Sequence, residues 1–208
     1  ESSPSPPLRT TFSKLIASLA SSSSPMRKAF EKVGCAGVLI RTLRQARQRD
    51  ELGALALALS ATTETSEEVV SSGGVTILVN ILTSCGVEDA QVTNAALLAL
   101  STLGKKSPTL LFEAMRRDGA IRPLLHLVQH DTTRASASTL IASLAADEPS
   151  RAALVDHDAP LLLCRLLHEG THAESKIGVV ELCEAVGELS RDRAAKKVVL
   201  REKGIEGI

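Results

Sequence analysis

A six-residue string occurs twice in this 208-residue chain. The letters LIASLA stand at residues 15–20 and again, unchanged, at residues 140–145. A proline follows each copy after about five residues, at Pro25 and Pro149, and nine residues after the proline comes Gly34 or Asp158. Because equal local sequence favours equal local structure, this recurrence predicts a stack of similar units rather than one irregular core.

A wider register surrounds the string. One position of this register is occupied, at intervals of 39, 46, 39 and 46 residues, by Gly34, Gly73, Gly119, Asp158 and Gly204. An aliphatic residue follows the first four at both five and nine residues, namely Leu39, Leu43, Leu78, Leu82, Leu124, Val128, Leu163 and Leu167. The longer intervals predict longer loops around residues 84–91 and 168–175.

Each unit is predicted to contain three helices. Apolar residues recur at three and four positions, and alternating β-branched runs are absent. Typical first, second and third helices are expected at 108–117, 121–129 and 92–103. The glycine supplies a left-handed turn between the first and second helices, and Asp158 tolerates the same conformation. The pairs Ser24-Pro25 and Ser107-Pro108 are expected to start helices, with serine at the N-cap and proline at the first helical position.

The register resembles the armadillo repeat. Residues 118–128, DGAIRPLLHLV, resemble the family's Gly-x-Ile-Pro-x-Leu-Val-x-Leu-Leu stretch, and residues 99–103, ALSTL, resemble its Ala-Leu-x-Asn-Leu stretch with Thr102 in the asparagine position. HEAT repeats are the nearest alternative, but they usually have two helices and lack the glycine. The resemblance implies an all-α fold, a right-handed α-α superhelix (solenoid) of three-helix repeats, whose third helices line a concave groove.

The expected domain organisation follows from these registers. Residues 1–9 contain three prolines and three serines and are predicted to form an extended linker. The repeats then occupy residues 10–208 as a partial repeat at 10–33, repeats at 34–72, 73–118, 119–157 and 158–203, and the start of a further repeat at 204–208. Because the last unit is incomplete, we expect either that the chain continues beyond Ile208 or that a partner caps it.

Composition excludes several classes of function. Lys and Arg total 24 and Asp and Glu total 24, so the uniform basic field of a nucleic-acid binder is absent. With three Phe and no Tyr or Trp, the chain cannot build stacking platforms or aromatic cages. The four cysteines form no C-x-x-C motif and are interpreted as reduced thiols. No apolar run is long enough for a membrane span, and a cytoplasmic location is expected.

No catalytic, cofactor-binding or metal-binding constellation is evident. The pairs His126/His130 and His168/His172 have i, i+4 spacing, but no third ligand accompanies either pair, and the second pair is expected in a loop. We interpret all four as surface histidines. There is no Gly-x-Ser-x-Gly elbow for a serine nucleophile. The sequence therefore predicts a protein that is not an enzyme and needs no cofactor.

The groove positions differ from those of armadillo proteins that import nuclear cargo. Those proteins carry a tryptophan ladder and an asparagine ladder on their third helices. The corresponding tryptophan positions here hold Lys14, Ala54, Leu98, Thr139 and Glu184. The asparagine positions hold Ser18, Ala58, Thr102, Ser143 and Glu188. Since no position matches, the chain is not predicted to be an adaptor of the nuclear-import type.

The predicted partner-binding groove consists of small neutral residues and becomes acidic toward the C-terminus. Its candidate residues are Lys14, Ser18, Asn94, Leu98, Thr102, Thr139, Ser143, Glu181, Glu184 and Glu188. The three glutamates have i, i+3, i+7 spacing and share one helix face. They form either a solvated face or a docking surface for a segment that carries Lys or Arg.

These observations predict a protein-interaction scaffold. The expected partner is an extended or helical segment of a protein, basic if the glutamates take part, in a cytoskeletal, polarity, trafficking or signalling assembly. The alternative is a substrate-recruiting domain of a multidomain enzyme such as a U-box-type ubiquitin ligase.

Overall fold

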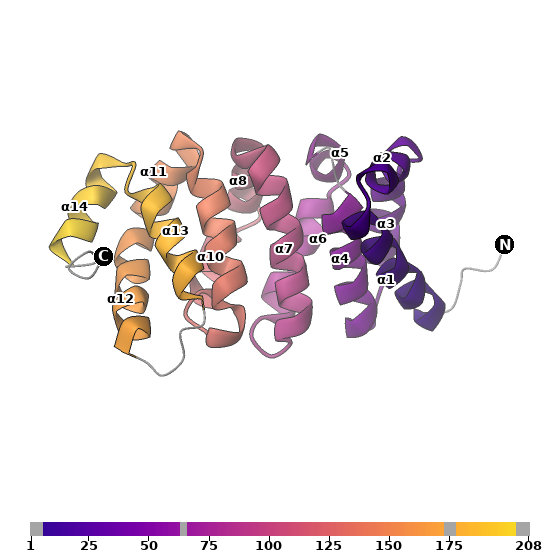
Figure 1. The fold of residues 1–208 in the computed structure, drawn as a ribbon, viewed down its shortest axis with the longest axis horizontal. Coiled ribbons are helices and arrows are strands. Elements are labelled where there is room, and N and C mark those ends of the chain that lie inside the picture. Colours follow the sequence, from indigo (N-terminus) through magenta and orange to yellow (C-terminus); the bar gives the residue numbers. More distant parts are fainter. Residues whose placement is uncertain (1–5, 63–65, 173–177, 203–208) are drawn as a thin grey trace.

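The computed structural model describes residues 6–62, 66–172 and 178–202 (Figure 1). These residues form α-helices and no strand. The helices are α1 (Pro6–Ser22), α2 (Ser24–Lys32), α3 (Cys35–Gln45), α4 (Arg49–Thr62), α5 (Ser66–Ser71), α6 (Gly74–Cys85), α7 (Ala90–Lys106), α8 (Pro108–Arg117), α9 (Ile121–Leu127), α10 (Asp131–Ala145), α11 (Glu148–Asp156), α12 (Ala159–His172), α13 (Val179–Leu189) and α14 (Arg193–Arg201).

The helices repeat as three-helix units along one axis. The successive units are α2–α4, α5–α7, α8–α10 and α11–α13. Helix α1, which precedes them, occupies the third-helix position of a unit, and α14, which follows them, occupies the first-helix position. The third helices α1, α4, α7, α10 and α13 stand side by side in sequence order, with the second helices behind them (Figure 1). The arrangement confirms the predicted all-α repeat architecture.

Left-handed residues join the first and second helices of each unit. The backbone angle φ is 67° at Gly34, 74° at Gly73, 71° at Gly119 and 59° at Asp158. Asp158 is the only residue other than glycine with a positive φ in the described part of the chain. The sequence predicted all four turns, and the fifth position, Gly204, lies outside the described residues.

Two helix starts differ in detail from the prediction. Ser107 is the N-cap of α8 and Pro108 follows it, as predicted. In α2 the N-cap is Ser23, so Ser24 is already the first helical residue and its predicted N-cap role is wrong. The helix accommodates Pro25 because the first-turn N–H groups have no intrahelical acceptor in any case.

The predicted linker at residues 1–9 is wrong over its second part. Helix α1 begins at Pro6, and the Arg9 side chain forms an ion pair with Glu51 of α4, which is buried. Proline is compatible with the first turn of a helix, and the ion pair fixes that turn against the neighbouring helix. The remaining linker residues, 1–5, lie outside the described part of the chain.

The predicted loop around residues 84–91 is shorter than expected, and the predicted loop around residues 168–175 is helical up to His172. Helix α6 continues to Cys85 and α7 begins at Ala90, so their connection spans only residues 86–89. Helix α12 continues to His172, which places His168 and His172 on a helix rather than in the predicted loop. Residues 173–177 are outside the described ranges.

A continuous apolar core runs along the stack. The last leucine of each third helix, Leu59, Leu103, Leu144 or Leu189, is at most 1% exposed. Alanines on these helices are equally buried and permit the helices to approach closely. Leu19, the corresponding leucine of α1, is 36% exposed, so α1 lacks part of the cover that the other third helices have.

Candidate partner-binding groove

The ten predicted groove residues lie on four of the five third helices. Lys14 and Ser18 are on α1, Thr139 and Ser143 are on α10, and the remaining six are on α7 (Asn94, Leu98, Thr102) and α13 (Glu181, Glu184, Glu188). The repeat register therefore places all of them on the row of third helices, as the sequence predicted. Their surroundings differ from one helix to the next.

Helix α4 interrupts the predicted row. Its two ladder positions, Ala54 and Ala58, are 3% and 0% exposed. The groove positions of α4 therefore offer no accessible side chain. Lys14 and Ser18, which are exposed on α1, are separated by this helix from the candidates on α7, α10 and α13.

A recess of about 520 Å³ lies where α7, α10 and α13 meet. The residues that line it are Lys105, Thr139, Ala142, Ser143, Ala146, Glu184, Gly187 and Glu188. Four of the ten predicted residues are thus brought together. The space exists because small side chains line it: apart from the chain neighbours of Gly187 and the backbone of its own helix, no atom lies within 4 Å of the place where a Cβ would be. The volume is within the usual range for binding pockets.

Hydroxyl groups on α10 line the middle of the recess. The Thr139 hydroxyl donates to the Ala135 carbonyl at 2.9 Å, and the Ser143 hydroxyl donates to the Leu140 carbonyl at 2.8 Å. Both protons are therefore used within the helix. An approaching segment finds hydroxyl oxygens that can accept hydrogen bonds, Thr139 being the more accessible of the two.

The three candidates on α7 have different environments. The Asn94 side-chain amide donates to the Thr132 carbonyl at 2.9 Å and so bridges α7 to the start of α10. The Thr102 hydroxyl donates to the Leu98 carbonyl at 2.9 Å within the helix. The Leu98 side chain is 46% exposed. Asn94 therefore stabilises the row itself, whereas Leu98 offers apolar contact surface.

The charge of the recess is mixed rather than uniformly acidic. Arg191 forms an ion pair with Glu188, with 2.9 Å between guanidinium nitrogen and carboxylate oxygen. Lys105, at the end of α7, lines the opposite side of the recess. Within the described residues, no ion pair includes Glu181 or Glu184. The predicted negative field is consequently limited to these two residues and is balanced by a cation across the recess.

The first histidine pair is accounted for by a local contact. His126 lies in the last turn of α9 and His130 is the N-cap of α10. Their Nε2 atoms are 3.4 Å apart, a distance at which one ring nitrogen can donate to the other. His126 also borders a hollow of about 560 Å³ beside α6 and α9, away from the row of third helices. Among the described residues, no group of three or more His, Cys, Asp or Glu side chains is arranged to hold a metal ion.

The cysteines are free thiols. Burial raises the pKa of Cys35, and burial together with the nearby negative charge of Glu202 raises that of Cys164. A raised pKa keeps a thiol protonated at neutral pH and lowers its reactivity. In the part of the chain that the structure describes, no helix has both the length and the apolar character needed to cross a membrane.

The prediction from sequence missed four residues that line the recess, Lys105, Ala142, Ala146 and Gly187, and it also missed Arg191, which pairs with Glu188. Gly187 stands where both copies of the six-residue string have alanine, which is a signal that the register contains. Arg191 is three residues after Glu188, a spacing at which helical side chains meet. Lys105 carries no such signal, because only the packing of α7 beside α10 brings it to the recess.

Comparison with known proteins yields matches of structure but not of sequence. No known family model matches the chain, and neither does any curated protein. An engineered protein solved by the Northeast Structural Genomics Consortium superposes with a TM-score of 0.84 at 22% identity, covering 99% of this chain and 83% of that one.

A designed armadillo repeat protein has a TM-score of 0.80 at 16% identity, over 97% of this chain and 84% of that one. The chain has an armadillo-like repeat fold. A second designed armadillo repeat protein, in complex with the peptide (KR)4, has a TM-score of 0.76 at 16% identity, over 93% of this chain and 80% of that one. At these identities the likeness concerns the fold alone, and the armadillo architecture explains the glycine turns and the row of third helices.

Proposed function

We propose that this armadillo-like chain is a non-enzymatic protein-interaction scaffold that binds a segment of another protein across α7, α10 and α13. The recess shared by these three third helices carries the proposal, because it is open, has small side chains at its base and bears opposite charges at its two sides. One structurally similar designed armadillo protein was solved with a basic peptide, which supports a partner of peptide size.

The charges define which segment fits. A Lys or Arg side chain of the partner would lie over Glu184 on α13, and a neutral or acidic side chain would lie near Lys105 on α7. The intervening α10 offers the Thr139 hydroxyl and the small surface of Ala142 to the partner backbone. Since the glutamate is exposed, its charge contributes more to association rate and specificity than to affinity. Cytoplasmic location and membership of a particular assembly stay predictions.

Selection from a random-peptide display library tests the proposal. Enriched peptides are synthesised with a fluorescent label, and their dissociation constants are measured by fluorescence polarisation. Reversing two charges with Glu184→Lys and Glu188→Lys should weaken a peptide containing Lys or Arg by about tenfold or more, less so at high salt. Gly187→Leu should weaken binding by filling the recess.

A matched control separates the recess from general surface charge. Glu113 is an exposed glutamate on the first helix α8, outside the recess. Glu113→Lys should leave the dissociation constant unchanged. If no peptide is enriched, or if the enriched peptides bind Gly187→Leu as tightly as the unaltered chain, the recess is not the binding site.

A further inference from the structure

The histidine pair at the junction of α9 and α10 has the geometry of a metal chelate. The ring centroids of His126 and His130 are 4.7 Å apart, whereas their Nε2 atoms are only 3.4 Å apart, so the rings converge at their Nε2 ends. Histidine nitrogens lie about 2.0–2.1 Å from zinc, and two of them on a tetrahedral ion are about 3.3–3.4 Å from each other. Around a square-planar or octahedral ion the same bond lengths give about 2.9 Å, so the observed separation matches zinc.

Hydrogen bonds hold the chain between the two histidines in place. His126 lies in the last turn of α9 and His130 is the N-cap of α10, so the pair spans the turn between two helices. The Arg134 guanidinium donates to the carbonyls of Val128 and Gln129 in this turn, at 3.3 Å and 3.2 Å. A braced turn presents both rings with little further loss of chain entropy on binding, which favours a bound ion.

The repeat architecture does not require histidines at these positions. The two residues follow the left-handed residue Gly119 by seven and eleven positions. In the other three units the same positions hold Arg41 and Gln45, Asn80 and Ser84, and Arg165 and Glu169. Since no other unit has a histidine at either position, the pair is a property of this unit and not of the fold.

We propose that His126 and His130 chelate a zinc ion through their Nε2 atoms, and that water completes its coordination. Each neutral imidazole donates its Nε2 lone pair and keeps its proton on Nδ1, while water molecules leave the hydrated ion. Among the described residues, no third His, Cys, Asp or Glu joins the pair in a group arranged to hold a metal. With only two protein ligands the ion is exchangeable, unlike the ion of a closed four-ligand site. The proposal goes beyond the interpretation from sequence, in which both are surface histidines.

The surroundings of the pair leave room for the ion and its water. His126 is exposed and borders the hollow of about 560 Å³ beside α6 and α9. Glu88 and Arg122 line this hollow as well, so one carboxylate and one guanidinium act on a cation there. Asp131, which follows the second histidine, is already paired with Arg134. Because these charges balance, coordination by the imidazoles rather than a negative field has to supply the affinity.

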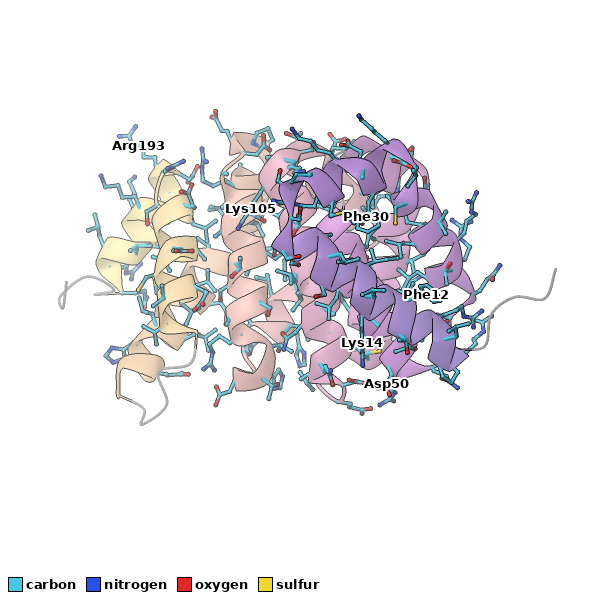
Figure 2. The ribbon with its side chains drawn as sticks, turned by 45° about the vertical axis from the view of Figure 1, so that its right-hand side comes forward. Phe12, Lys14, Phe30, Asp50, Lys105 and Arg193 are labelled. Atoms are coloured by element: carbon cyan, nitrogen blue, oxygen red, sulfur yellow. The ribbon has the colours of Figure 1, made fainter. Side chains whose placement is uncertain are left out.

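The proposed zinc site is independent of the peptide recess. Lys105, labelled in Figure 2, marks the recess at the end of α7. On α10 the recess begins at Thr139, nine residues after His130, which corresponds to about 13 Å along the helix axis. An ion at the junction of α9 and α10 therefore does not occupy the recess. Failure of either proposal leaves the other standing.

Isothermal titration calorimetry of the chelator-treated 208-residue chain with zinc chloride tests the site. All proteins carry His168→Ala, because His168 and His172 form the other i, i+4 pair. Half the binding free energy of a complete four-ligand site corresponds to a dissociation constant of about 1–200 µM, and we expect one ion per chain in this range. His126→Ala and His130→Ala should each weaken zinc binding by about tenfold or more, because only one imidazole remains. His130 makes no side-chain capping bond to α10, so its replacement removes no helix cap.

Two further variants serve as controls. His157 is an exposed histidine at the C-cap of α11, and His157→Ala should leave the dissociation constant for zinc unchanged. Arg122→Gln removes a cation one helical turn before His126 and should tighten zinc binding by roughly two- to fivefold. A gain in affinity cannot arise from a misfolded variant, and circular dichroism establishes that every variant is folded.

Nitrogen-15 spectra of histidine-labelled protein identify the ligands. Zinc should shift the Nε2 resonances of His126 and His130 and leave those of the other histidines in place. The proposal is overturned if no zinc binds at concentrations up to about 1 mM. It is equally overturned if His126→Ala binds zinc as tightly as its parent, or if the resonances of other histidines shift instead.

Discussion

The two copies of the string LIASLA form helices of the same register but have different surroundings. In α10, Leu140 and Leu144 are both 0% exposed, whereas the corresponding Leu15 and Leu19 of α1 are 51% and 36% exposed. Ile16 and Ser18 are likewise more exposed than Ile141 and Ser143, and only the two alanines of the string keep the same environment, the final one, Ala20 or Ala145, being 0% exposed in both copies. The same six residues therefore form a helix in both places but are buried to different extents.

The reason lies in the two interfaces that each third helix makes. One face packs on the following unit, and both copies of the string have such a neighbour, as the contact of α1 with α4 and of α10 with α13 shows. The other face packs on helices that precede the third helix, and α1 lacks that cover. In a linear repeat array, stability is a sum of such neighbour terms, so one sequence can contribute different amounts at two positions.

The largest expected effect is on the buried copy. Leu144→Ala should lower the free energy of unfolding by about 2–5 kcal/mol, the range for a buried leucine. Leu19→Ala, the same substitution in α1, should cost about 1 kcal/mol or less, because the side chain is already partly hydrated. Urea unfolding at low protein concentration measures both. Equal losses for the two variants would contradict the difference in burial.

A glycine of α7 provides the next test, since it stands where both copies of the string end in alanine. A Cβ on Gly104 would approach the Ser143 hydroxyl oxygen to 2.6 Å and Leu111 Cδ2 to 3.2 Å. Gly104→Ala should therefore destabilise the chain by about 1–2 kcal/mol, overpacking outweighing the gain in helix propensity. Thermal unfolding measures the loss.

The second copy of the string supplies the control for this variant. Ser143→Ala removes the hydroxyl that a Cβ on residue 104 would meet. Combined with Gly104→Ala, it should recover most of the lost stability, so that the double-mutant cycle shows a coupling of about 0.5 kcal/mol or more. Additive losses would mean that the strain arises elsewhere.

Local features of the fold were predictable from the sequence. The left-handed turns at Gly34, Gly73, Gly119 and Asp158 depend on backbone preferences of single residues, and all four were predicted correctly. The three-helix unit depends on apolar spacing within about ten residues. Both signals are contained in short segments of the chain.

Contacts between distant residues were not predictable. Arg9 is helical rather than part of a linker because it pairs with Glu51, a residue far along the chain. Lys105 belongs to the recess because α7 packs beside α10, and the charge of that recess changes as a result. The burial of Ala54 and Ala58, which separates the α1 candidates from the others, also depends on neighbouring helices rather than on the spacing of these residues.

The residue that caps the helix after the second copy has a pH-dependent role. Asp147 accepts hydrogen bonds from the Ser150 backbone at 3.1 Å, the Ser150 hydroxyl at 2.6 Å and the Thr109 hydroxyl at 2.7 Å. Burial alone would raise the pKa of Asp147, but these hydrogen bonds and the charge of Arg151 outweigh it, so the pKa lies below its usual value. The ionised carboxylate therefore stabilises the fold at pH values above its usual pKa.

Replacing this cap should cost about 0.5–2 kcal/mol at neutral pH for Asp147→Ala. Because the folded-state pKa is lowered, the contribution of the carboxylate begins to fall near its usual pKa, about 4, and is lost as pH falls through the lower folded pKa, so the difference between the unaltered chain and Asp147→Ala should shrink over that range. Ser23, the N-cap that follows the first copy, makes no side-chain capping bond, so Ser23→Ala should change little. Urea unfolding at neutral pH and at acidic pH measures the free energy of unfolding of each variant. If Asp147→Ala remains less stable than the unaltered chain in acid by the same amount, the ionised cap is not the cause of the loss.

The smallest expected effect has the opposite sign. Gly187 on α13 stands where the string has Ala17 and Ala142, and no atom beyond its chain neighbours and the backbone of its own helix lies within 4 Å of a Cβ built there. Gly187→Ala should raise the free energy of unfolding by about 0.5–1 kcal/mol, because alanine restricts the unfolded chain and favours the helix without meeting a neighbour. Thermal unfolding beside Gly104→Ala measures this. The two substitutions would then change the free energy of unfolding in opposite directions. The surface of α7 at Gly104 is covered by Ser143 and Leu111, whereas the surface of α13 at Gly187 is open to the recess. A loss of stability in Gly187→Ala would mean that the recess is filled in solution.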